Sequence, residues 1–242
     1  MIYGQIDLLN QTKKYRFNNI LDIGMGRGEA SLFFLKEGKT VYATGGALDF
    51  YNPDNELLRK VSFYPDINVE DMSVFKSNFF DAIWMAHVLE HVQNPGIALQ
   101  EIHRILKPEG FLFIMVPPYK PNLVMGHITT GWNIGTLMYN LLISGFNIKQ
   151  GSFIYHGYNV AGFVKKADFK LPLLNFNSND YCLLKDYYPF EFKLQDVIKK
   201  RKINWEWYPK NIKIKYFWRK KTYRNLFPIF LKKILKRYII KQ

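Results

Sequence analysis

Three closely spaced glycines, Gly24, Gly26 and Gly28, constrain the fold of this chain more than any other feature. An apolar run, 19–23, precedes them, and the helix-like run 29–36 follows, so the pattern predicts a strand, a tight turn and a helix. Glycine has no Cβ, which lets the backbone of such a turn approach a ligand closely. The helix that follows presents N–H groups and the positive end of its dipole. A dinucleotide-binding G-x-G-x-x-G loop fits poorly, because Gly28 falls one residue early.

Strand and helix patterns alternate along the first two thirds of the chain. Apolar runs predict strands near residues 40–44, 80–86, 111–116, 146–155 and 158–165. Helices are expected near 6–9, 29–36, 95–106 and 133–142, with Asn94 as a helix cap and Gly38 as a helix end. This alternation predicts an α/β fold with a mostly parallel sheet that is covered on both faces and ends in an antiparallel strand. Ligands of such sheets bind beyond the carboxyl ends of the strands.

Four segments together resemble the motifs of one enzyme family. Residues 20–28 resemble motif I of the class I S-adenosylmethionine-dependent methyltransferases, and residues 80–92, 106–110 and 116–118 resemble later motifs of its small-molecule branch. That branch includes ubiquinone-biosynthesis-type and surface-glycan-type enzymes. The resemblance spans about residues 18–165. It implies a Rossmann-like, doubly wound, mostly parallel seven-stranded sheet, S-adenosylmethionine as cofactor, and methyl transfer by in-line displacement from its sulfonium.

The resemblance also implies which residues bind the cofactor. The loop around its methionine part corresponds to Asp22, Gly24, Gly26 and Gly28. The position beside the sulfonium corresponds to Ala86 and His87, and the adenine contacts fall near Asn68 and Val69, with Glu70 or Asp71 as alternatives.

The end of the second expected strand departs from the family pattern. The family has an acidic residue there that accepts hydrogen bonds from both ribose hydroxyls, whereas this chain has Gly45. Loss of a bidentate carboxylate weakens cofactor binding by about 1.5–3 kcal/mol. Asp49 is the nearest acid. Three outcomes stay open: Asp49 folds back to the ribose, the cofactor binds weakly, or the protein no longer methylates.

Histidines are the candidate catalytic bases. An imidazole titrates near neutral pH, so His127, in the long loop after the expected strand 111–116, is either a general base for an acceptor hydroxyl or a residue that caps the loop. His87 is the second candidate base. His91 is expected to pack as a structural residue. No Cys or carboxylate stands at a standard metal spacing from these histidines, so no metal is expected.

The last 58 residues carry all of the net charge of +14. Residues 1–184 contain 16 Lys and Arg against 16 Asp and Glu, whereas residues 185–242 contain 18 against four. We therefore divide the chain into a methyltransferase domain, 1–170, and a basic, aromatic, helical C-terminal extension, 171–242. Residues 226–242 form a cationic amphipathic pattern, which suits an anionic membrane surface, RNA, or docking on the domain itself. Nucleic acid is the less favoured partner, because no RNA-binding module is recognisable.

The sequence also bears on the location of the protein and on the atom that accepts the methyl group. A single cysteine, the lack of a signal-like N-terminus and the lack of an apolar run of about 18 residues favour a cytoplasmic protein, with the inner face of the membrane as a further place for the extension. The amino-methylating tetrapeptide Asn-Pro-Pro-aromatic is missing, which favours oxygen as acceptor. The sequence thus predicts O-methylation of a small molecule or of a surface-polysaccharide or glycan precursor. Two alternatives are a non-catalytic scaffold with a degraded ribose site and an RNA methyltransferase.

Overall fold

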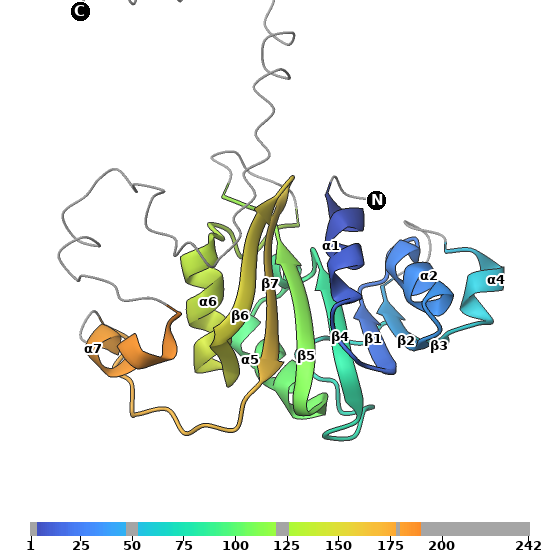
Figure 1. The fold of residues 1–242 in the computed structure, drawn as a ribbon. Helices are drawn as coiled ribbons and strands as arrows, with labels where there is room; N and C mark the ends of the chain where they lie inside the picture. The colour runs from blue at the N-terminus through green and yellow to red at the C-terminus, as the bar shows by residue number, and fades with distance from the viewer. Residues whose placement is uncertain (1–3, 47–52, 120–125, 178–179, 190–242) are drawn as a thin grey trace, which may run out of the picture.

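A seven-stranded, mostly parallel sheet forms the centre of the protein. The computed structural model describes residues 4–46, 53–119, 126–177 and 180–189. The strands are β1 (Asn19–Ile23), β2 (Thr40–Gly45), β3 (Ser62–Pro65), β4 (Phe80–Ala86), β5 (Leu106–Val116), β6 (Phe146–His156) and β7 (Asn159–Lys166). Their order in the sheet is β3-β2-β1-β4-β5-β7-β6 (Figure 1). Strands β1 to β5 are parallel, and β7 runs antiparallel to both β5 and β6. The predicted fold class is confirmed.

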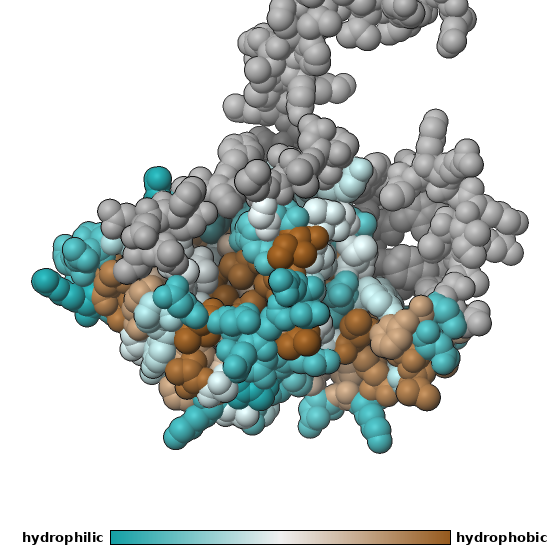
Figure 2. Space-filling model, turned by 180° about the vertical axis from the view of Figure 1, so that it is seen from behind, coloured by the Kyte–Doolittle hydropathy of each residue, from teal (hydrophilic) through white to brown (hydrophobic). Residues whose placement is uncertain are grey.

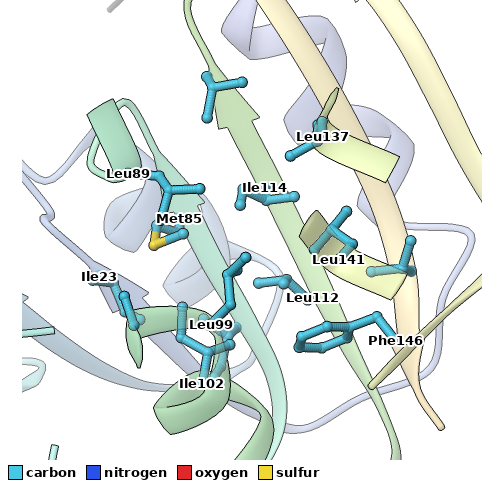
Figure 3. Packing of buried hydrophobic residues seen from close by; sticks show 14 of the residues in the cluster. Ile23, Met85, Leu89, Leu99, Ile102, Leu112, Ile114, Leu137, Leu141 and Phe146 are labelled. Carbon is cyan, nitrogen blue, oxygen red and sulfur yellow. The ribbon is translucent and has the colours of Figure 1, made fainter. Parts of the chain in front are cut away.

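Helices cover both faces of this sheet. The described helices are α1 (Gln5–Thr12), α2 (Glu29–Lys36), α4 (Asn55–Leu58), α5 (Pro95–Ile105), α6 (Ile134–Ile143) and α7 (Asp180–Leu184), with 3-10 turns η1 (Leu89–His91) and η2 (Lys185–Tyr187). Side chains alternate between faces along a strand, so each buried strand contributes to two cores. One core joins the sheet to α5 and α6 and contains Met85, Leu112 and Ile114 (Figure 3). The other joins it to α1 and α2 and contains Trp84 and Phe113.

The sequence patterns located most elements and missed several short ones. Strand β3 and helix α4, each four residues long, lie in a stretch without clear periodicity. The last predicted helix of the domain begins at Asn133, whose side chain accepts from the backbone N–H of Thr136 in a capping box. Asn94, in contrast, does not cap α5, because its side-chain amide donates to Glu70 Oε2 at 2.7 Å. Strand β5 begins at Leu106 and not at Phe111, with a register shift against β4.

The segment after β7 packs on the α6 side of the domain. Leu184 is fully buried in the α5–α6 core, and Leu171, Leu174 and Tyr188 pack against that core. Polar side chains cover the middle of the face shown in Figure 2, and hydrophobic ones gather toward the edge where α7 lies. Leu173 is 88% exposed. The described residues 171–177 and 180–189 thus include side chains that pack against the domain. The predicted division at residue 170 stays a prediction, and residues 190–242 lie outside the described residues.

Within the described ranges of the chain, no helix is long and apolar enough to cross a bilayer.

Candidate cofactor and acceptor site

The glycine loop lies where the strand order reverses, between β1 and β4. Gly24, Gly26 and Gly28 all have left-handed backbones, with φ of 69°, 54° and 82°. A Cβ on Gly24 would lie 2.5 Å from Val88 Cγ2, and one on Gly28 would lie 2.2 Å from Leu57 Cδ2. Both the backbone conformation and the lack of space therefore require glycine at these two positions. The loop after β1 and the loop after β4 meet across the Gly24–Val88 contact.

Asp22 connects the two elements that flank the glycine loop, strand β1 and helix α2. Its carboxylate accepts from Ser31 Oγ at 2.6 Å and from the backbone N–H of Ser31 in the first turn of α2. The side chain is 2% exposed, and burial raises the pKa of Asp22 to about 6 although the Ser31 hydrogen bonds oppose the rise. Asp22 thus ties the end of β1 to the start of α2, which makes it a positioning residue for the glycine loop.

The end of β2 supports the same loop from its other side. The hydroxyl of Thr44 accepts from the N–H of Gly24 at 3.3 Å, and its carbonyl accepts from the N–H of Met25 at 2.8 Å. Gly45 follows at the edge of the site, where a Cβ would make ordinary contacts with Phe63 at 3.5 Å and Met25 at 3.6 Å. A side chain therefore fits at Gly45. Asp49, the predicted substitute for the ribose acid, lies outside the described residues.

The turn after β3 contains the predicted adenine contacts. Asn68 is exposed, and its side-chain oxygen accepts from the N–H of Glu70, whereas the Val69 side chain is buried in the α5–α6 core. Glu70 accepts from Asn94 and from the backbone N–H of Gln93, and the Asn94 hydrogen bonds lower the pKa of the Glu70 carboxyl. Glu70 thus holds the start of α5. These assignments to adenine stay predictions, and Asn68 and Asp71 are the exposed residues among them.

His87 follows Ala86, the last residue of β4, in a strained left-handed conformation with φ of 57°. Its N–H donates to the carbonyl of Met115 at 2.9 Å. Its Nε2 lies 2.9 Å from Asn159 Oδ1, and its Nδ1 lies 3.2 Å from Glu90 Oε1. The amide of Asn159 is oriented by its own donation to the carbonyl of His156, so Oδ1 accepts from Nε2. Both ring nitrogens of His87 therefore have hydrogen-bond partners. Neither has a lone pair directed at a methyl-accepting substrate.

A second group of side chains continues from His87 through Glu90. Glu90 is fully buried, and one of its carboxylate oxygens lies within 4.8 Å of ring nitrogens of both His91 and His127. The two histidine rings pack edge to face at 4.9 Å. Over the described ranges, two buried side-chain polar atoms lack a hydrogen-bond partner, Glu90 Oε2 and Trp132 Nε1. Both belong to segments that follow the carboxyl ends of β4 and β5, where an acceptor would approach the cofactor.

Sequence reasoning missed two residues of this site. Glu90 directly precedes His91, and its burial on a 3-10 turn has no periodic signal in the sequence. Asn159 is 72 residues from His87 and reaches it only because β7 returns antiparallel to β5. No local pattern could have indicated that contact.

The sheet order and the position of the site define the class of the fold, that of the Rossmann-like class I S-adenosylmethionine-dependent methyltransferases. Residues 21–114 match the model of a family described as Methyltransferase domain. This stretch is therefore similar to a methyltransferase domain, and the match and the fold support S-adenosylmethionine as the cofactor, in agreement with the sequence prediction.

Solved structures share the fold at low sequence identity. A 1,6-didemethyltoxoflavin-N1-methyltransferase of Burkholderia thailandensis, with S-adenosylhomocysteine bound, matches at 20% identity and a TM-score of 0.54, over 68% of this chain and 77% of its own. A SAM dependent methyltransferase of Archaeoglobus fulgidus matches at 15% identity and a TM-score of 0.54, over 67% and 94%. A curated protein of Dictyostelium discoideum with the name "Probable polyketide synthase 28" is 30% identical over 105 residues, which is 43% of this chain. The match spans only 4% of that relative's length.

Proposed function

We propose that this protein is an S-adenosylmethionine-dependent methyltransferase that methylates a hydroxyl oxygen of a small molecule or of a surface-polysaccharide or glycan precursor. The observation that carries the proposal is the junction of the β1 and β4 loops, where Gly24 lies against Val88 beside the buried polar group around His87. This is the switch point of the sheet, at which doubly wound folds bind their ligands.

The residues of the glycine loop fit the cofactor by their backbone. S-adenosylmethionine, when bound, supplies a methyl group that is already activated on a sulfonium. The left-handed glycines bring main chain close to the ligand, and Asp22 and Thr44 hold that main chain rigid. Catalysis then rests on positioning the acceptor in line with the methyl group and on excluding water.

The acceptor side of the site lies along the line from His87 to His127. Both ring nitrogens of His87 are occupied, so this residue positions the β4 loop. The acceptor hydroxyl loses its proton beside His127, which lies next to His91 and the buried carboxylate of Glu90. The Burkholderia relative is named for methylation of a nitrogen, so amines belong in the acceptor panel.

The first experiment separates cofactor binding from transfer. Calorimetry with S-adenosylmethionine and S-adenosylhomocysteine measures binding, and transfer of a radiolabelled methyl group to nucleotide sugars, lipid-linked oligosaccharides, small phenols and amines measures activity. We expect saturable cofactor binding and transfer to a hydroxyl acceptor. No binding at millimolar cofactor contradicts the enzyme proposal, and transfer to amines alone contradicts the oxygen assignment.

Gly45 favours a second candidate, a methyltransferase-like scaffold without catalysis. The end of β2 carries no carboxylate for the ribose, although the structure has room for one. The scaffold predicts no cofactor binding, whereas the enzyme predicts binding that a carboxylate at this position would strengthen. An RNA methyltransferase, the third alternative, predicts RNA affinity that falls steeply with salt.

The extension is proposed to bring the enzyme to an anionic membrane surface at the cytoplasmic side. Residues 226–242 support this by their cationic amphipathic sequence alone, because they lie outside the described residues. Co-sedimentation with vesicles containing phosphatidylglycerol, compared with neutral phosphatidylcholine vesicles, tests the proposal. We expect binding to the anionic vesicles that is lost on deletion of 226–242. Equal binding of both chains contradicts it.

A further inference from the structure

We propose that Glu90, His91 and His127 form a binding site for a divalent transition-metal ion of the Zn²⁺ type. One potential ligand atom from each residue lies within 4.8 Å of the other two. Ligands of a tetrahedral Zn²⁺ at bond lengths of about 2.0–2.1 Å are about 3.3 Å apart. The three ligand atoms therefore need to approach one another by at most about 1.5 Å, which rotation of the exposed His91 and the half-buried His127 can provide.

The buried carboxylate of Glu90 is the observation that points to a cation. Its Oε1 is 3.2 Å from His87 Nδ1, but its Oε2 has no hydrogen-bond partner in the part of the chain that the structure describes. The residue has no exposed surface, so bulk solvent does not reach this oxygen. A buried carboxylate oxygen without a partner is costly, and a bound cation is the kind of ligand that removes this cost.

His91 has the arrangement of a metal-binding histidine. Its Nδ1 lies 2.7 Å from the carbonyl oxygen of Gly126, to which it donates. That hydrogen bond fixes the tautomer and leaves the lone pair on Nε2, as in metal-bound histidines whose other ring nitrogen donates to a backbone carbonyl. The hydrogen bond between His91 and Gly126 could not be predicted from the sequence, because the two residues are 35 positions apart.

The loop that carries His127 is tied to Glu90 itself. The backbone N–H groups of Ile128 and Thr129 donate to the Glu90 carbonyl at 2.7 and 3.0 Å, and Thr129 Oγ1 donates to the carbonyl of Val92 at 3.3 Å. The residues just after His127 are thus held against η1 and against Val92, which follows it. Such support keeps the three ligands together before an ion arrives.

The donor set selects the kind of ion and leaves room for an acceptor. Two imidazoles and one carboxylate suit Zn²⁺, Co²⁺ or Fe²⁺ and not the oxygen-seeking Mg²⁺ or Ca²⁺. Three protein ligands leave the fourth position open, as in catalytic zinc sites. The sequence expectation of no metal rested on spacing along the chain, whereas His127 joins Glu90 and His91 only in space.

A catalytic role of the ion rests on the proposed function, although metal binding itself does not. An acceptor hydroxyl at the open position would release its proton to solvent more readily, because the cation stabilises the alkoxide. The oxygen lone pair then forms the O–C bond to the methyl group while the C–S bond of the sulfonium breaks and leaves a neutral sulfide. In this scheme His127 is a ligand and not a base.

The test uses the full chain in a Cys182→Ser background, because the thiol of Cys182 is exposed and thiolates are zinc ligands. The chain is stripped with chelator and titrated with Zn²⁺ by calorimetry and with Co²⁺ by visible absorption. We expect one Zn²⁺ per chain and the strong absorption of tetrahedral Co²⁺. No saturable Zn²⁺ binding, together with octahedral Co²⁺ absorption only, overturns the proposal.

Matched variants assign the site. His127→Ala and Glu90→Gln should each weaken Zn²⁺ binding at least about 100-fold, whereas His156→Ala, which removes a histidine paired with Asp7, should leave it unchanged. Thermal unfolding shows whether each variant folds. If a variant does not fold, the Co²⁺ spectrum of the parent chain still tests the proposal. Unchanged binding in a folded His127→Ala chain overturns the proposal. If the chain binds the cofactor but not the metal, the metal site is refuted and the proposed function is unaffected. If it binds the metal but not the cofactor, only the proposed function is refuted.

Discussion

The buried carboxyl of Asp22 makes the stability of this protein depend on pH in an unusual direction. Burial raises its pKa to about 6, whereas in an unfolded chain an Asp has a pKa of about 3.9. Between these values the folded chain holds a proton that the unfolded chain has lost. The free energy of unfolding therefore falls as pH rises through this window. From pH 5 to pH 7 the loss due to Asp22 is about 1 kcal/mol.

Asp22→Asn is the perturbation that isolates this effect. Asn keeps the size of the side chain and an oxygen that accepts from Ser31, but it does not titrate. Urea unfolding of both chains at pH 5, 6 and 7, without cofactor, gives the free energy of unfolding of each. Other groups cancel in the difference between the two chains, including Glu101, whose pKa is lowered by the hydrogen bond from Arg104.

We expect the stability of the parent chain relative to Asp22→Asn to fall by about 1 kcal/mol from pH 5 to pH 7. A difference that stays constant over this range refutes the reasoning, because it would mean that Asp22 ionises at the same pH in both states. Ser31→Ala is the companion variant: it removes a hydrogen bond that favours the charged carboxylate, so the pKa should rise further and the fall should move to higher pH.

The glycine loop, the end of β2 and the His87 network each give a further prediction. Gly24→Ala should lower the free energy of unfolding by about 2–4 kcal/mol and abolish cofactor binding in calorimetry, whereas Gly38→Ala, equally left-handed but in open space, should cost about 1 kcal/mol and leave cofactor binding intact. Gly45→Asp should fold normally and tighten cofactor binding about 10- to 100-fold by calorimetry; weaker binding would show that this position does not face the ribose. Asn159→Ala should lower the free energy of urea unfolding by about 1–3 kcal/mol, because the ring N–H of His87 loses its acceptor; a loss below about 0.5 kcal/mol contradicts the network.

Local patterns predicted the parts of the fold that local interactions determine. The three glycines have the left-handed backbones that a tight turn after β1 requires, and the apolar run that became β4 has the predicted limits. Asn133 forms the helix cap of α6, whereas Asn94 at a similar position is drawn away by Glu70. A capping residue is therefore predictable only when no distant group competes for its side chain.

The candidate site was predictable only in part, because its chemistry depends on contacts far apart in the sequence. His87 was expected beside the sulfonium, but the partners that occupy both of its ring nitrogens include Asn159, 72 residues away. His91 was expected to be structural and His127 to be a general base or a loop cap, and the structure brings them together with Glu90. Cofactor contacts of Gly45, Asn68 and Val69 stay predictions.

The return of β7 between β5 and β6 has a consequence for the order of events during synthesis. Because β7 is antiparallel, its first residue, Asn159, meets His87 at the end of β4, and His156 just before it meets Asp7 of α1. A nascent chain therefore contains the whole glycine loop long before it can complete the surroundings of His87. Cofactor added to ribosome-bound chains should stabilise only those in which β7 has left the exit tunnel, so the ligand would act on the last step of folding and not on the first.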